Sequence, residues 1–201
     1  MKRLWPVGLL LVLVVALAIG FSLGGHPTAA RTQALATPYR SRRVTQTHGA
    51  QAQSLFVPVS PSWWRTVSKA SVVTVDGQAT TLPPHQPVLF FAWWCPHCHM
   101  ALEELRHTPQ LQHITLVSVW INAGNPSLPI TSAHNAALVT EKALSALGVH
   151  VPAAHLLLAM PNSAINRVLH GVPTLVVPKG NTPMEAAGVP TTIGDWIRWI
   201  Q

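Results

Sequence analysis

Two thiols dominate the chemistry that this sequence could perform. Cys95 and Cys98 are the only cysteines of the 201-residue chain, and Pro96 and His97 separate them. Where a Cys-x-x-Cys opens a helix, unpaired backbone N–H groups and the positive helix end stabilise a thiolate. His97 adds a hydrogen-bond donor or a positive charge, and the spacing lets Cys98 attack a mixed disulfide formed by Cys95. The tetrad is therefore a candidate redox dithiol.

Three other kinds of site use the same residues. Cys95-Pro96-His97-Cys98-His99 matches C-x-x-C-H, the pattern of c-type haem attachment, although the flanking pattern is α/β rather than all-helical. The two cysteines with His97 and His99 suit copper or zinc, yet no second Cys-x-x-Cys or His pair completes a structural zinc site. A plain disulfide across two residues would stabilise the domain little. We favour the redox dithiol over these three.

The elements around the cysteines form a strand–helix–strand unit. Val88 to Ala92 is a continuous apolar run, typical of a strand covered on both faces. A helical pattern follows from Met100 to His107, and Ile114 to Ile121 is a second strand. At this spacing the two strands should be parallel.

The rest of the domain supplies further elements of both kinds, while His150 to Met160 leaves helix and strand open. The predicted elements are a helix starting at Ser60-Pro61-Ser62, a hairpin from Val72 to Leu82 turning at Asp76-Gly77, a helix from Ser132 to Leu147 stopped by Gly148, a short helix from Asn162 or Ser163 to Leu169, a strand from Leu175 to Val177, an edge strand from Met184 to Ala187, and a last helix after a capping box at Thr192-Ile193-Gly194-Asp195.

Two segments carry a family resemblance. Phe90-Phe91-Ala92-Trp93-Trp94-Cys95-Pro96-His97-Cys98 resembles the active-site strand and helix start of the thioredoxin superfamily. Gly171-Val172-Pro173-Thr174 resembles its second signature, a cis-proline loop that lies against the Cys-x-x-Cys. The resemblance covers about Val72 to the C-terminus. It implies a thioredoxin-like α/β fold, with a central mixed β-sheet flanked by helices and a helical insertion before the cis-proline strand.

Within the superfamily, the Cys-Pro-His-Cys tetrad and the valine before the proline look like DsbA-type oxidants, while the anchored layout looks like TlpA- or ResA-type proteins. The resemblance implies that Cys95 is an exposed nucleophile, that Cys98 is the resolving thiol and that His97 tunes the thiolate. It also implies a docking surface for a substrate strand at Val172 and Pro173, beside Trp94. No cofactor is expected beyond the redox-active Cys95–Cys98 disulfide, and no metal.

One position departs from the family pattern. Many thioredoxins carry a buried acidic residue six positions before the first cysteine, and this chain has Leu89 there. The usual internal proton acceptor for Cys98 is therefore missing, so that water, a histidine or the substrate must serve. This departure leaves the reductase direction less supported.

The N-terminal part of the chain predicts export. Lys2 and Arg3 precede an uncharged run, and a helix over residues 1–25 would be long enough to span a bilayer. We expect a retained single-pass anchor with the domain outside the cell membrane. A cleaved signal peptide, which would make the protein secreted, is the alternative. Residues 26–55 are predicted to be a flexible linker and residues 56–201 the folded domain.

Together these features predict a membrane-tethered thiol–disulfide oxidoreductase that donates disulfides to exported proteins. The helix end, His97 and the formal net charge of +7 all favour a thiolate, and a stabilised thiolate makes the disulfide a stronger oxidant. The expected partners are exported protein thiols and disulfides and a membrane or extracytoplasmic redox partner. Lys and Arg are too sparse to predict nucleic-acid binding. The alternatives are a reductase for cytochrome c maturation or similar clients, and a metal- or haem-binding module.

Overall fold

The computed structural model describes residues 56–124, 129–180, 182–190 and 192–201. The predicted anchor, residues 1–25, and the predicted linker, residues 26–55, lie outside the described residues. None of the helices that the structure describes has the length and hydropathy of a membrane span. Phe56, where we expect the folded domain to start, is buried and stacks on Trp199 with ring centroids 4.6 Å apart.

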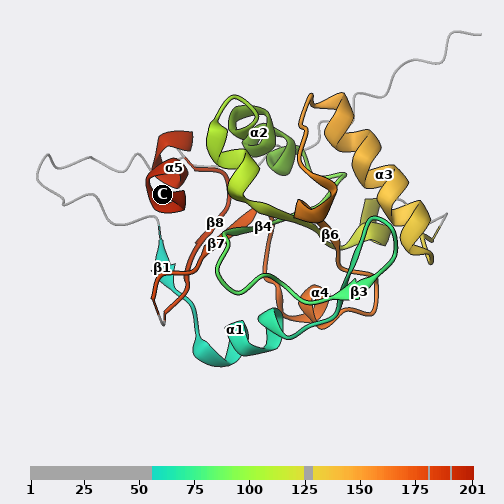
Figure 1. Ribbon diagram of the computed structural model, residues 1–201, viewed down its shortest axis with the longest axis horizontal. Helices are drawn as coiled ribbons and strands as arrows, with labels where there is room; N and C mark the ends of the chain where they lie inside the picture. Colours follow the sequence, from blue (N-terminus) through green and yellow to red (C-terminus); the bar gives the residue numbers. More distant parts are fainter. Residues whose placement is uncertain (1–55, 125–128, 181, 191) are drawn as a thin grey trace, which may run out of the picture. The chain divides into compact units, whose positions relative to one another are not determined.

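Eight strands form one mixed sheet in the order β1-β8-β7-β4-β5-β6-β2-β3 (Figure 1). β4, β5 and β6 run parallel to one another, and the other neighbouring pairs are antiparallel. The predicted strand–helix–strand unit is confirmed by the parallel pairing of β4 with β5. The strands are β1 Val57–Pro58, β2 Val72–Thr74, β3 Ala79–Thr80, β4 Val88–Phe91, β5 Thr115–Ser118, β6 Leu156–Leu158, β7 Thr174–Val177 and β8 Met184–Ala187.

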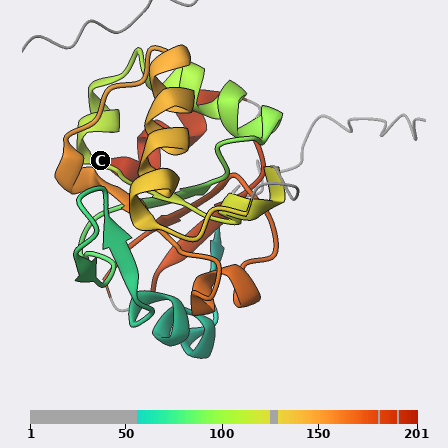
Figure 2. The same cartoon turned by 90° about the vertical axis from the view of Figure 1, so that its right-hand side faces the viewer.

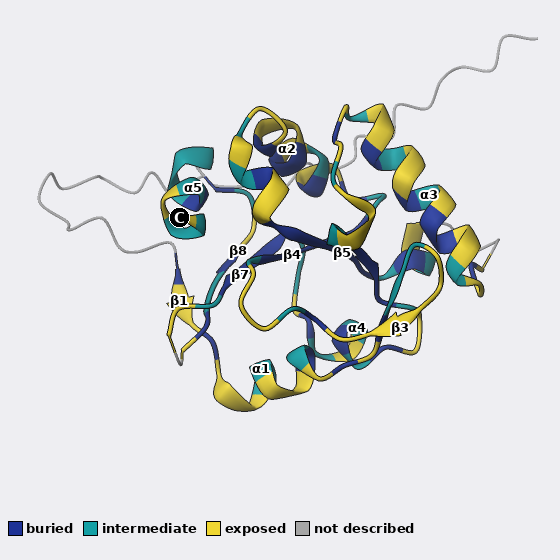
Figure 3. Cartoon of the chain, viewed as in Figure 1, coloured by how far each residue is buried: buried dark blue, intermediate teal, exposed yellow. Residues whose placement is uncertain are grey.

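Helices cover both faces of the sheet. Those of one face are α2 (Pro96–Leu105), α3 (Ala133–Ala146) and α5 (Ile193–Ile200), and those of the other are α1 (Pro61–Ser68) and α4 (Ala164–Val168) (Figures 1 and 2). The side chains of β4 alternate between the two resulting cores, and all four are buried (Figure 3). This two-sided burial is the reason for the continuous apolar run. The predicted thioredoxin-like α/β fold is confirmed.

The insertion before the cis-proline strand is more than helical. It contains α3 and also β6, which lies between β5 and β2 in the sheet. The ambiguous run from His150 to Met160 therefore supplies a short 3₁₀ turn, Ala153–His155, and an interior strand. All three leucines of β6 are buried, as an interior strand requires.

Two predicted strands differ from those observed. β8 is not an edge strand, because β1 pairs with it from the outside, placing Val57 opposite Glu185. The second strand of the predicted unit ends at Ser118 rather than Ile121. Trp120 has a left-handed backbone, with φ of 47°, and a 3₁₀ turn follows over Ile121–Gly124. A bulky residue with positive φ does not continue a strand.

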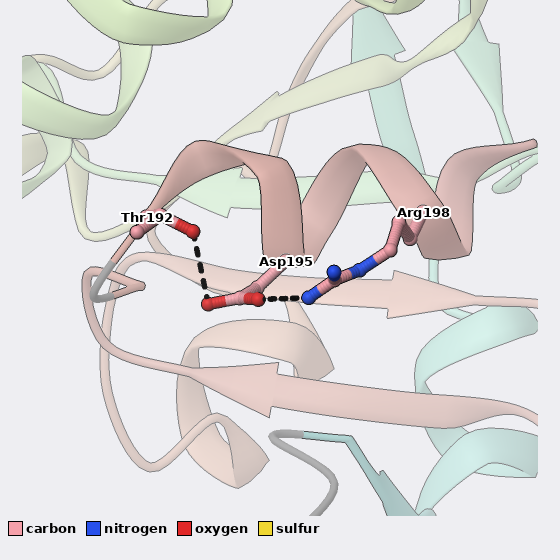
Figure 4. A network of polar contacts seen from close by, with 3 residues as sticks. All are labelled: Thr192, Asp195 and Arg198. Atoms are coloured by element: carbon pink, nitrogen blue, oxygen red, sulfur yellow. Dashed lines mark hydrogen bonds and ion pairs between the residues drawn. The ribbon is translucent and has the colours of Figure 1, made fainter. Parts of the chain in front are cut away.

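The helix ends mostly follow the local sequence signals. Ser132 Oγ accepts the N–H of Asn135 at the start of α3, and Gly148 follows its end with φ of 65°. At the start of α5, the Thr192 hydroxyl donates to the Asp195 carboxylate instead of accepting a backbone N–H, and Asp195 also pairs with Arg198 (Figure 4). The predicted capping box is therefore incomplete: Thr192 and Asp195 bind each other, but the Thr192 side chain caps no backbone N–H.

Candidate active site

The two cysteines lie at the start of α2, directly after β4. Cys95 is the N-cap residue and Pro96 the first helical residue, a position where the missing proline N–H costs no hydrogen bond. Both cysteines are free thiols. Cys95 is 6% exposed and Cys98 is 1% exposed. The expectation of an exposed Cys95 is therefore wrong: both thiols are buried, Cys95 less deeply than Cys98.

The second signature lies against the first. The peptide bond between Val172 and Pro173 is cis, and Cys95 Sγ lies 3.9 Å from the carbonyl oxygen of Val172, to which its thiol donates. Seventy-seven positions separate these two residues in the chain. The expected arrangement of the two signatures is thus observed, while the roles of Val172, Pro173 and Trp94 in substrate binding stay predictions.

Cys98 lies beneath Cys95 in apolar surroundings that include Leu89. Burial raises the pKa of the Cys98 thiol far above its ordinary value, and the neighbouring Cys95 raises it further. The backbone N–H of Ala92, 3.4 Å from Cys98 Sγ, lowers this pKa in part. Leu89 itself is completely buried. The structure thus places an alkyl side chain where the family pattern has an acid.

The charges around the site are fewer than the whole-chain composition implies. His97 is exposed, and its side chain forms no hydrogen bond or ion pair with the described residues. Of the thirteen Lys and Arg residues, six lie in residues 1–55 together with none of the six acidic residues. Residues 56–201 thus carry seven basic and six acidic residues. The net charge of +7 is mostly a property of the N-terminal segment and supports a Cys95 thiolate less than expected.

His99 is committed to the protein backbone. Its Nε2 donates to the carbonyl oxygen of Trp93 at 2.7 Å, so that this nitrogen has no lone pair free for a metal. Among the residues with described positions, no three of the His, Cys, Asp and Glu side chains are grouped as a metal site would need. The haem and metal alternatives stay predictions, with Nδ1 as the ring nitrogen of His99 that keeps its lone pair.

Sequence reasoning missed a set of residues that support the cysteine loop. Trp93 and Trp94 donate their indole N–H groups to the carbonyl oxygens of Ile121 and Trp120, at 2.9 and 3.1 Å. Trp120 is in turn bound to Asn166 of α4. The adjacent tryptophans before Cys95 were a usable signal for this support, whereas nothing in the local sequence marks Asn166.

Comparison with known proteins finds similar solved structures, among them a disulfide oxidoreductase. No protein-family model matches the chain, and no curated protein is significantly similar to it. A secreted Mycobacterium tuberculosis disulfide oxidoreductase, homologous to E. coli DsbE, is 13% identical, with a TM-score of 0.43 over 67% of this chain and 98% of its own. This similarity is too low to carry the activity of that protein over to this chain.

The arrangement itself is suited to thiol–disulfide exchange. The less buried thiol lies at a helix N-terminus beside a backbone carbonyl of an irregular loop, and the second thiol lies behind it, within reach of the first. A partner sulfur bonded to Cys95 would therefore lie close to Cys98.

Proposed function

We propose that the protein is an extracytoplasmic thiol–disulfide oxidoreductase that donates disulfides to exported proteins. The observation that carries the proposal is the placement of Cys95 Sγ 3.9 Å from Val172 O, with Cys98 directly behind it. This geometry leaves a backbone edge beside the reactive sulfur, against which an extended client strand can dock at Val172 and Pro173. Trp94, half-buried and adjacent to Cys95 in the chain, is proposed as the other wall of this docking surface.

Donation proceeds from the Cys95–Cys98 disulfide. A client thiolate attacks Cys95 Sγ, the Cys95–Cys98 bond breaks, and its electron pair goes to Cys98, which takes up a proton. A second client thiolate then attacks the client sulfur of this mixed disulfide and releases Cys95. The client loses two electrons, and the protein ends as the dithiol. A membrane or extracytoplasmic redox partner must then remove two electrons to restore the disulfide.

The direction of net transfer depends on Cys95. Because burial raises the pKa of Cys98, thiolate stabilisation of the reduced form can come only from the first cysteine. Its position at the N-cap of α2 and the neighbouring exposed His97 are the features that would stabilise it. The reductase direction requires Cys98 to attack as a thiolate, which its burial opposes.

The location follows from the N-terminal segment. A cationic start and a long uncharged run favour an anchor or a signal sequence, and both export the domain. We infer that clients and the redox partner are met outside the cytoplasm, with the domain held at the cell membrane.

Equilibration of the full chain with glutathione tests this function. We expect a reduction potential well above that of thioredoxin, roughly −270 mV. A potential near that value would contradict donation and favour the reductase. Cys95→Ser should abolish exchange. Cys98→Ser cannot form the Cys95–Cys98 disulfide, but its Cys95 thiolate should still attack a client disulfide and stay trapped as the mixed disulfide. If Cys95→Ser kept full exchange, the assignment of the nucleophile would be wrong.

A further inference from the structure

Asn166, a half-buried residue of α4, binds two other segments of the domain. Its side-chain oxygen accepts the backbone N–H of Trp120 at 3.0 Å. Its side-chain nitrogen donates to the carbonyl oxygens of Ala159 and Met160 after β6, at 3.2 and 2.8 Å. Its own backbone carbonyl accepts the indole N–H of Trp120 at 2.9 Å. One asparagine therefore holds the ends of β5 and β6 against α4.

Trp120 connects Asn166 to the residue before Cys95 by hydrogen bonds. Its backbone N–H and indole N–H are bound by Asn166, while its carbonyl oxygen accepts the indole N–H of Trp94, the residue before Cys95. Among the described residues, Trp120 alone combines a positive φ with a residue type other than glycine. Such a backbone is costly for a bulky side chain and persists only where surrounding contacts impose it. Asn166 supplies two of those contacts.

The chain that follows α4 continues into the Val172–Pro173 loop, on the other side of Cys95 Sγ. α4 ends at Val168, five residues before Pro173. Trp120 and Val172 both pack against the core beneath α1 and α4. The Cys95 thiol in turn contacts the carbonyl oxygen of Val172. Asn166 is therefore connected to Trp94 through the hydrogen bonds of Trp120, and to Val172 through the chain that follows α4.

We propose that Asn166 is a positioning residue which, through Trp120, sets the separation of Trp94 and Cys95 from the Val172–Pro173 loop. This inference rests on the proposed function, since that separation is the width available to a client strand beside Cys95. A client long enough to contact both walls depends on the spacing. A small dithiol that reaches only the sulfur does not.

The test compares two reductants of the oxidised full-length protein. One is an extended peptide with two cysteines, and the other is dithiothreitol. Asn166→Ala should slow the reaction with the peptide about tenfold, the loss expected for one buried hydrogen-bonding group, and leave the dithiothreitol rate unchanged. Arg167→Ala is the matched control, because Arg167 is exposed on the same helix and binds only Asn162 O. It should change neither rate.

A conservative variant separates positioning from stability. Asn166→Asp keeps the acceptor for Trp120 N–H but places a carboxylate against two carbonyl oxygens. It should lower the melting temperature at least as much as Asn166→Ala while recovering most of the peptide rate. Peptide rates that simply follow the melting temperature across the variants would overturn the proposal. Trp94→Phe, which removes only the indole donor, should combine non-additively with Asn166→Ala.

Hydrogen exchange decides the proposal even without activity. Asn166→Ala should accelerate amide exchange both at residues 93–95 and at residues 169–172. If the wild-type protein reacted with neither dithiol, the proposed function would fail, yet this coupled exchange would still support the positioning role. Faster exchange confined to residues 159–166 would overturn it.

Discussion

Cys98, the resolving thiol of the proposed mechanism, has no acidic side chain beside it among the described residues. It is buried with Leu89 and Leu102 around it, and Cys95 is the only titratable group among the described residues that acts on its pKa. Both burial and Cys95 raise that pKa, and the single hydrogen bond from Ala92 opposes them only in part. Attack by Cys98 on a mixed disulfide should therefore be slow at neutral pH, since the thiolate is the attacking species.

The buried thiol should make the reduced protein less stable in alkali. Because the pKa of Cys98 is raised on folding from an ordinary value of 9.0, the unfolded state loses the proton first as the pH rises. The free energy of unfolding should fall from about pH 9 upward, by about 1.4 kcal/mol per pH unit. Denaturant titrations of the reduced protein between neutral pH and pH 10 measure this slope.

Cys98→Ala is the control for the alkaline slope. This variant removes the titrating group but retains a small apolar side chain, so its stability should fall less steeply above pH 9 than that of the wild type. Equal slopes for the two proteins would show that another group accounts for the alkaline loss.

The segment that follows β5, residues 119–124, positions the loop that carries the cysteines. Its carbonyl oxygens accept both tryptophan indoles of the loop, and its last residue, Gly124, lies directly against them. A Cβ atom on Gly124 would come within 2.5 Å of Trp94 Cδ1 and 2.7 Å of Trp93 Cζ2. No side chain can be accommodated there unless both tryptophans or the backbone of Gly124 move, and neither indole can move without disturbing its bond to Ile121 or Trp120.

Gly124→Ala should therefore destabilise the domain by overpacking, by about 1–3 kcal/mol. It should also change the tryptophan fluorescence of the folded state and slow exchange at Cys95. Gly194→Ala is the matched control, because the nearest atom to a Cβ there is Thr192 Oγ1 at 3.7 Å. That variant lies in α5 and should be neutral or slightly stabilising. Equal stability of the two variants would contradict the packing argument.

At the scale of the molecule, the described domain and the N-terminal segment differ in character. Residues 56–201 are nearly balanced in charge, whereas residues 1–55 hold six basic and no acidic residues. The domain is closed at its N-terminal side by β1, which pairs with β8, and by Phe56, which stacks on Trp199. Lys179 Nζ lies 4.2 Å from the centroid of that same ring. These contacts tie Phe56 and β1 into the described domain, and the start of the folded unit near Phe56 stays a prediction.

A polypeptide of residues 56–201 should fold and retain thiol–disulfide exchange, because both walls of the site and all eight strands lie within it. Residues 60–201 should be less stable, since this shorter chain loses β1 and the Phe56 side chain and exposes the edge of β8. Circular dichroism melting of both polypeptides, with exchange assays below the lower melting temperature, measures the difference. Identical melting curves would contradict the predicted domain start.

Local patterns were sufficient for much of the fold and for half of the site. The apolar run of β4, the cysteines at the start of α2 and the proline ahead of β7 each depend on neighbouring residues, and their types carry the information. A helix start, a strand and a turn are specified over a few positions. The order of these segments along the chain then allowed the two signatures to be placed together.

Contacts between distant segments decided the remainder. β6 is interior because α3 returns the chain to the edge of β5, and β2 then pairs with its other side. Three consecutive leucines do not predict this position. Trp120 and Asn166 are 46 positions apart, and the deep burial of Cys98 depends on helices and strands from across the domain. The residue types of the candidate redox site follow from the sequence. The shielding of its second thiol and the support of its walls follow only from packing, because each requires several segments to meet at one point.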